Sequence, residues 1–125
     1  MWGAKNFYFG DNISLGVSDL GRAVAWYQEK LGLRLTPLKS EDFEAFLSFS
    51  KDDDTGLALV VIPPGETKAN VEGHPILFTK KIEATHSDFS SKGINVGTIQ
   101  SDSGGNRFFR FRDLEGNEIE VCIEP

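Results

Sequence analysis

The chain has 125 residues, a length that fits one domain with a single hydrophobic core. Its net charge of -6 and its pI near 4.8 disfavour binding to nucleic-acid phosphates, and no segment approaches the ~20 consecutive apolar residues that cross a bilayer. Cys122 is the single cysteine, so no internal disulfide can form, and the N-terminal part lacks the pattern of a secretory signal. We therefore expect a cytoplasmic protein that binds neither nucleic acid nor membrane.

The first half of the chain predicts a strand, a helix and three further strands. Apolar residues alternate with small polar residues over 12–18, which is typical of a half-buried strand. Asp19 is a suitable N-cap, apolar residues then recur at helical spacing, and Gly32 is a natural stop, so we expect a helix over 20–31. The three further strands are predicted near 33–39, 43–50 and 56–62.

The second half predicts the same order of elements. Pro63-Pro64-Gly65 breaks the pattern, and the polar residues 66–73 are interpreted as the connection between the halves. The elements that follow are a strand at 74–79, a helix at 81–92 ended by Gly93, and strands near 94–100, 107–112 and 118–124. We therefore predict a single domain over 1–125 with two βαβββ modules, at about 11–63 and about 74–125.

A shift of 62 positions, from Asn12 to His74, aligns the two halves. Such a repeated unit creates paired positions around a pseudo-two-fold axis. Few of the pairs are identical, but most are of similar structural type. The pairs are Asn12 with His74, Leu20 with Ile82, Tyr27 with Phe89, Phe46 with Phe108, Phe49 with Phe111, Ala58 with Glu120, and Pro63 with Pro125.

Three motifs in the chain are similar to those of a known family. They are Val17-Ser18-Asp19-Leu20, then Trp26-Tyr27 followed by Leu31-Gly32-Leu33, and the run Arg112-Asp113-Leu114-Glu115-Gly116-Asn117-Glu118-Ile119-Glu120-Val121. The chain resembles the glyoxalase, bleomycin-resistance and extradiol-dioxygenase superfamily, the vicinal oxygen chelate proteins, over essentially its whole length. The resemblance implies an α+β fold of two tandem βαβββ modules, which form a curved mixed sheet around a cavity with the helices on the outer face. Leu114 stands where the family's D-P-x-G-N turn has proline.

The resemblance also implies four symmetry-related positions for metal ligands, at Asn12, Ala58, His74 and Glu120. Relatives that chelate metal use two His and one Glu, so His74 and Glu120 match the pattern, Asn12 is a weaker ligand, and Ala58 is no ligand. Imidazole and carboxylate together suit Fe, Mn, Zn or Ni. The alternative is that His74 is a polar residue at a strand start and Glu120 a partner for a nearby Arg or Lys.

Strand alternation gives Glu120 a second possible role. Glu120 shares a strand face with Cys122 and Glu124, opposite an apolar stripe, so its carboxylate is expected on the concave side of the sheet. Without a metal, Glu120 would act as a general base with His74 as its proton partner. Cys122 has no activating sequence context and is interpreted as a small buried residue rather than a nucleophile, and His86 is expected to be exposed.

Arg110 and Phe108 share a face of the strand at 107–112, and with Arg107 and Ser14 they are assigned to substrate binding. A guanidinium beside an aromatic ring favours an anionic or planar substrate through bidentate hydrogen bonds and stacking. The alternative is that these arginines are solvated or paired with the many carboxylates of the chain.

Two functions follow from these residues. The first is a small enzyme of the vicinal oxygen chelate type, a lyase, isomerase, dioxygenase or thiol transferase that uses a divalent metal; His74 and Glu120 favour it. The second is a metal-free protein that binds or sequesters a small molecule, as in the bleomycin-resistance branch; Asn12 and Ala58 favour it. The residues lean slightly toward the enzyme. The resemblance further implies a homodimer.

Overall fold

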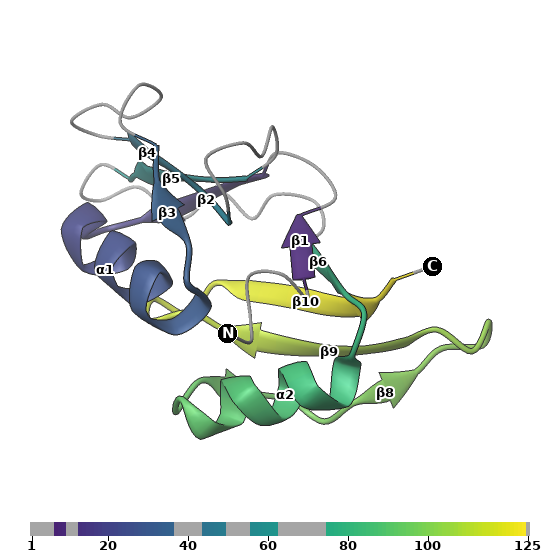
Figure 1. Ribbon diagram of the computed structural model, residues 1–125. Coiled ribbons are helices and arrows are strands. Elements are labelled where there is room, and N and C mark those ends of the chain that lie inside the picture. Colours follow the sequence, from purple (N-terminus) through teal and green to yellow (C-terminus); the bar gives the residue numbers. More distant parts are fainter. Residues whose placement is uncertain (1–6, 10–12, 37–43, 50–55, 63–74, 125) are drawn as a thin grey trace.

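The computed structural model describes residues 7–9, 13–36, 44–49, 56–62 and 75–124. These residues form two helices and two β-sheets, which lie as separate layers in Figure 1. Within the described residues, neither helix is long and apolar enough to span a membrane.

The first module consists of one helix and a four-stranded sheet. Its elements are β2 (Ile13–Val17), α1 (Leu20–Leu31), β3 (Arg34–Leu35), β4 (Glu44–Ser48) and β5 (Leu57–Val61), with strand order β2-β5-β4-β3. The Asp19 carboxylate caps α1 by accepting the Arg22 N–H at 3.2 Å, and Gly32 ends the helix at φ 71°, a conformation that favours glycine. These local signals explain why α1 has the bounds that the sequence predicts.

The second module repeats this plan with a larger sheet. Its elements are β6 (Ile76–Thr79), α2 (Ile82–Ser91), β7 (Asn95–Val96), β8 (Gln100–Ser101), β9 (Arg107–Arg112) and β10 (Glu118–Ile123). The sheet has the order β1-β6-β10-β9-β7, in which β1 is the N-terminal strand Phe7–Phe9, and β8 also pairs with β9. The two-module α+β architecture that the sequence predicts is therefore confirmed.

The structure departs from the predicted elements in two places. The strand expected over 94–100 is two short strands, because this segment has one residue more than the facing part of β9: Val96 lies opposite Phe111, but Gln100 lies opposite Phe108. A three-residue strand that the sequence did not predict, β1 (Phe7–Phe9), pairs antiparallel with β6 at the edge of the second sheet. Both departures involve very short strands, for which the local pattern carries little information.

The sheet registers confirm the 62-residue repeat for the parallel strand pairs. Ser14 lies opposite Ala58 between β2 and β5, and Ile76 lies opposite Glu120 between β6 and β10. The antiparallel hairpins do not follow the same shift. Ala58 pairs with Phe46, whereas Glu120 pairs with Arg110 rather than with Phe108.

The expected equivalence of Phe46 with Phe108, and of Phe49 with Phe111, is therefore wrong by two residues. The connections that flank β4 and β9 differ in length, so a single shift cannot hold through both hairpins. Because the difference is even, each residue keeps its side of the sheet.

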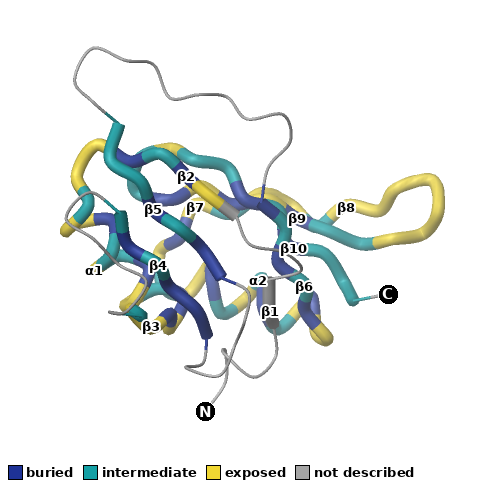
Figure 2. The backbone as a smooth tube through the Cα atoms, turned by 90° about the horizontal axis from the view of Figure 1, so that it is seen from above, coloured by how far each residue is buried: buried dark blue, intermediate teal, exposed yellow. Residues whose placement is uncertain are grey.

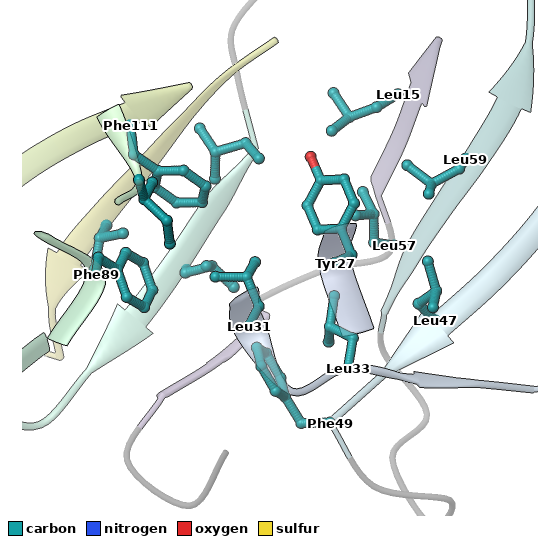
Figure 3. Close-up of a cluster of buried hydrophobic side chains, with 14 of the residues drawn as sticks. Leu15, Tyr27, Leu31, Leu33, Leu47, Phe49, Leu57, Leu59, Phe89 and Phe111 are labelled. Carbon is teal, nitrogen blue, oxygen red and sulfur yellow. The ribbon is translucent and has the colours of Figure 1, made fainter. Parts of the chain in front are cut away.

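Both helices pack their apolar faces on the odd-numbered residues of the strands. Tyr27 of α1 and Phe89 of α2, which the repeat pairs, are both completely buried. Figure 3 shows Leu31 of α1 between the phenylalanines Phe89 and Phe111 and the leucines of the first sheet. One continuous core therefore joins the modules, while exposed residues gather in the β8–β9 hairpin in Figure 2.

The C-terminal ends of the two helices exchange hydrogen bonds. Lys30 Nζ donates to the Lys92 carbonyl at 2.6 Å, and Lys92 Nζ donates to the Lys30 carbonyl at 3.2 Å. These two lysines are paired by the 62-residue shift, so the contact has the reciprocity of a pseudo-two-fold axis. Each ammonium lies at the end of the other helix, where the helix dipole favours positive charge.

Candidate functional site

The candidate site lies on the even-numbered face of β9 and β10, opposite α2. The odd-numbered face carries Phe109 and Phe111, which are buried with edge-to-face contacts to Phe89 of α2. The alternation of the strand therefore turns Arg110 to the other side, as the sequence predicts. There Arg110 lies directly opposite Glu120 in the antiparallel ladder.

A short chain of hydrogen bonds joins three side chains on this face. Arg110 Nε donates to Glu120 Oε1 at 3.3 Å, and the Cys122 thiol donates to Glu120 Oε2 at 2.9 Å. The Glu120 side chain is 15% exposed, whereas that of Arg110 is 45% exposed. Both oxygens of the Glu120 carboxylate thus accept a hydrogen bond, and the carboxylate is largely buried, whereas the Arg110 guanidinium is more exposed to solvent.

The environment of Cys122 keeps its thiol protonated. Partial burial, and then the hydrogen bond to Glu120, raise the pKa of Cys122 to about 12. The neutral thiol is a hydrogen-bond donor and not a nucleophile at neutral pH. The raised pKa agrees with the prediction that Cys122 is not a nucleophile. The thiol is not only a packing group, however, because it donates a hydrogen bond to Glu120.

Arg110 also belongs to a surface network. Its Nη1 lies 3.6 Å from Glu118, which in turn lies 3.4 Å from Arg112. The Arg110 guanidinium carbon is 5.9 Å from the centre of the Phe108 ring, within the range of a cation–π contact. The face therefore combines a half-buried aromatic ring with charges that are already paired.

The structure does not bring all the sequence-predicted residues together. Arg107 lies on the odd-numbered side of β9 and pairs with Glu83 of α2, away from Glu120. Ser14 is exposed on β2, in the other sheet. Phe108, Arg110 and Glu120 are the predicted residues that the structure places side by side.

Two expected metal ligands, Asn12 and His74, lie outside the described residues. Within the described part of the chain no group of three potential ligand side chains converges, and Ala58 offers no donor. Glu120 is paired with a guanidinium, whose charge opposes a divalent cation, and it also accepts a hydrogen bond from a protonated thiol. As arranged, the described residues do not fit a metal centre by themselves.

The pairing of Glu120 with Arg110 matches the alternative that Glu120 is a partner for a nearby arginine, whereas the bond from Cys122 was not predicted. Cys122 shares its face by alternation, a signal that was available, but the bond between the two side chains depends on rotamers that the sequence does not give. His86, expected to be exposed, is partly buried: its Nε2 donates to the Gly97 carbonyl at 2.8 Å and its ring contacts Phe109. His86 therefore holds the segment between β7 and β8 against α2.

Solved structures of similar fold include proteins of different kinds. An antibiotic-binding protein, TnmS3, from Streptomyces sp. CB03234 has a TM-score of 0.73 at 24% identity, covering 92% of this chain and 95% of its own. A lactoylglutathione lyase from Agrobacterium tumefaciens has a TM-score of 0.70 at 21% identity, covering 90% and 91%. A superfamily member from Sphaerobacter thermophilus DSM 20745 has a TM-score of 0.74 at 20% identity, covering 91% and 96%.

These likenesses establish the fold alone, since all are below 25% identity, and no curated protein matches the sequence. The sequence profile of one family matches residues 11–121, which is most of the chain. The chain therefore belongs to the Glyoxalase/Bleomycin resistance protein/Dioxygenase superfamily.

Proposed function

We propose that this protein binds a small organic molecule on the even-numbered face of β9 and β10, without a metal. The observation that carries the proposal is the Arg110–Glu120–Cys122 network beside Phe108. An aromatic ring with a few fixed polar groups is the usual composition of a small-molecule site. TnmS3, a protein of similar fold, is an antibiotic-binding protein.

The charges of this face favour a planar ligand with polar edges over a simple anion. Arg110 is paired with both Glu118 and Glu120, so little positive charge remains for an anionic group. Phe108 is half-buried and offers apolar area to a planar ring. The Glu120 carboxylate, held by Arg110 and Cys122, supplies an oriented acceptor for a ligand N–H or O–H.

The proposal is tested by calorimetric titration with bleomycin and a panel of planar antibiotics. The wild type is compared with Phe108→Ala and Arg110→Ala, and with Arg107→Ala as a control on the same strand but the opposite face. We expect at least one compound to bind the wild type and Arg107→Ala, and to bind the two site variants about 10-fold or more weakly. Equal affinities in all four proteins would place binding elsewhere and reject this site.

The second candidate is the metal-assisted enzyme that the residues His74 and Glu120 favour. Glu120 lies on the expected face of the final strand, which supports its role as an acid–base residue. Metal content is measured after purification without chelator, for the wild type, His74→Ala and Glu120→Ala. Near one equivalent of Fe, Mn, Zn or Ni that is lost in both variants would favour the enzyme, whereas no uptake by wild type would favour metal-free binding.

We also propose that the protein acts as a cytoplasmic homodimer. The even-numbered face of the first sheet carries the half-buried apolar residues Phe46, Ala58 and Val60, which a second copy would cover. Sedimentation equilibrium is expected to give twice the chain mass for the wild type and a monomer for Phe46→Glu. A monomeric wild type at micromolar concentration would contradict the dimer.

A further inference from the structure

The turn between β9 and β10, residues 113–117, contacts the first module through its side chains. We call it the 113–117 turn. Asp113 shapes it: its Oδ1 accepts the N–H groups of Glu115 at 2.9 Å and Asn117 at 2.8 Å. Gly116 has φ 86°, which favours glycine. The backbone of the turn is therefore fixed by hydrogen bonds within it. The side chains of Glu115 and Asn117 also reach residues of the first module.

Glu115 binds the junction between β2 and α1. Its Oε1 accepts the Ser18 N–H at 2.6 Å, and its Oε2 accepts the Asp19 N–H at 3.1 Å. Backbone N–H groups beside a helix N-terminus carry partial positive charge and lack partners within the helix, so a carboxylate is a favourable acceptor there. The start of α1 in the first module is thus held by a residue of the second.

Two further contacts join the same elements. Asn117 Nδ2 donates to the Gly16 carbonyl of β2 at 3.0 Å. The Tyr27 hydroxyl of α1 donates to Asp113 Oδ2 at 2.8 Å, and both groups are buried. The 113–117 turn therefore contacts β2, the junction and α1 at once.

These contacts lie where they can set the geometry of the candidate site. β2 ends at Val17, immediately before the bonded Ser18, and β10 begins at Glu118, immediately after the bonded Asn117. The two strands belong to different sheets, so no ladder fixes one against the other. Glu120 is only about 10 Å along β10 from the turn, at ~3.3 Å per residue.

We propose that Glu115 and Asn117 are positioning residues, which fix β2 and the first sheet relative to β10 and thereby the face that carries Glu120. Neither residue is among those that form that face. This inference rests on the proposed function for its effect on ligand binding, but its structural part stands by itself. Loss of either residue loosens the placement of one sheet against the other while each module keeps its fold.

The structural part is tested by NMR on the full chain without ligand, comparing wild type, Glu115→Ala, Glu115→Gln and Asn117→Ala. Amide exchange at Ser18 and Asp19 is expected to be about 10-fold faster in Glu115→Ala, and less changed in Glu115→Gln, which keeps one side-chain oxygen. Residual dipolar couplings of both sheets are expected to fit one alignment tensor in wild type and two in Glu115→Ala and Asn117→Ala. Glu83→Ala is the matched control, because it breaks an ion pair within the second module.

An unchanged exchange rate and a single tensor in Glu115→Ala, or an equal effect of Glu83→Ala, would overturn the proposal. Bleomycin titration provides the second readout: where wild type binds, Glu115→Ala is expected to bind at least 5-fold more weakly and Glu115→Gln to recover part of the affinity. Unchanged affinity in Glu115→Ala despite two tensors would reject the link to the site. Failure of wild type to bind counts against the proposed function, while the NMR comparison still decides the structural claim.

Discussion

The two modules solve the same problem, the start of a helix after a buried strand, in different ways. In the second module, Thr79 and Thr85 share a hydrogen bond at 2.7 Å, the Lys81 N–H donates to Thr79, and Thr85 donates to the Lys81 carbonyl. In the first module, the 62-residue shift places Val17 and Ala23 at the positions of these threonines.

Besides the local Asp19 cap, the first module therefore obtains polar contacts from the second module. Glu115, on the turn of the second module, accepts the backbone N–H groups that precede α1. The second junction is satisfied by residues of its own module, whereas the first combines the local cap at Asp19 with a tertiary contact from Glu115. Two duplicated modules can therefore share the same order of elements and still be stabilised by different contacts, one set within the module and the other partly between the modules.

The largest effect is expected where the first module depends on the second. Asp113→Ala removes the acceptor of Tyr27 and of the turn amides, and Asp113 is only 6% exposed, so about 3 kcal/mol of unfolding free energy should be lost. Urea unfolding measures the loss. Asp102→Ala is the control, because Asp102 accepts similar turn amides but on the exposed β8–β9 hairpin. Equal losses in both variants would show that the turn itself, not the contact between modules, is what matters.

The next largest loss of stability is expected when the two threonines at the start of α2 are replaced by the residues found at the equivalent positions of the first module. The double variant Thr79→Val with Thr85→Ala leaves the Lys81 N–H without its acceptor and should cost about 2 kcal/mol. Hydrogen exchange should rise at the start of α2 and remain unchanged at the start of α1. An increase at both helices would contradict the local character of this junction.

A smaller effect is expected for Tyr27→Phe, at about 1 kcal/mol near neutral pH. Burial, with Asp113 as the next cause, raises the pKa of Tyr27 well above 10.0. Above about pH 10 the unfolded chain therefore loses this proton while the folded chain keeps it, so wild-type stability falls as the pH rises. Denaturant titrations from pH 8 to pH 11 should show a steeper fall for wild type than for Tyr27→Phe. Parallel curves would exclude Tyr27 as a source of the alkaline sensitivity.

The smallest effect is expected at the contact that Lys30 and Lys92 make symmetrically between the modules. Lys30→Ala should lower the free energy of unfolding by roughly 0.5 kcal/mol, since it removes the hydrogen bond from Lys30 to the Lys92 carbonyl at the end of α2. Lys92→Ala should cost somewhat more, because Lys92 also pairs with Asp88 at 3.0 Å. Thermal unfolding of the single and double variants measures both. A larger loss for Lys30→Ala than for Lys92→Ala would reverse the expected order.

Much of the fold could be predicted because its signals are local. The cap at Asp19 and the stop at Gly32 lie next to the helix they bound, and α1 has the predicted range. Strand alternation likewise placed Arg110 and Glu120 on one side of their strands. The register of the antiparallel strands could not be predicted from local signals, since it depends on the lengths of the connections between the strands. The predicted equivalence of Phe46 with Phe108 was wrong for that reason.

The candidate site was predicted only in part. Glu120, Arg110 and Phe108 came from alternation and resemblance, while Arg107 faces α2 instead. The ligand set of Asn12 and His74 stays a prediction, since both lie outside the described residues. The hydrogen bond from Cys122 to Glu120 needed side-chain positions that no pattern encodes.

The sequence by itself determined the elements, their repeat and the face on which each strand residue lies, because periodicity and capping act over a few residues. The tertiary structure alone decided which distant groups meet. The hydrogen bonds of Glu115 to Ser18 and Asp19 join residues that are 97 and 96 positions apart in the sequence. Their partners are ordinary backbone amides, which leave no mark in the sequence, so only the packing of one module against the other could reveal them.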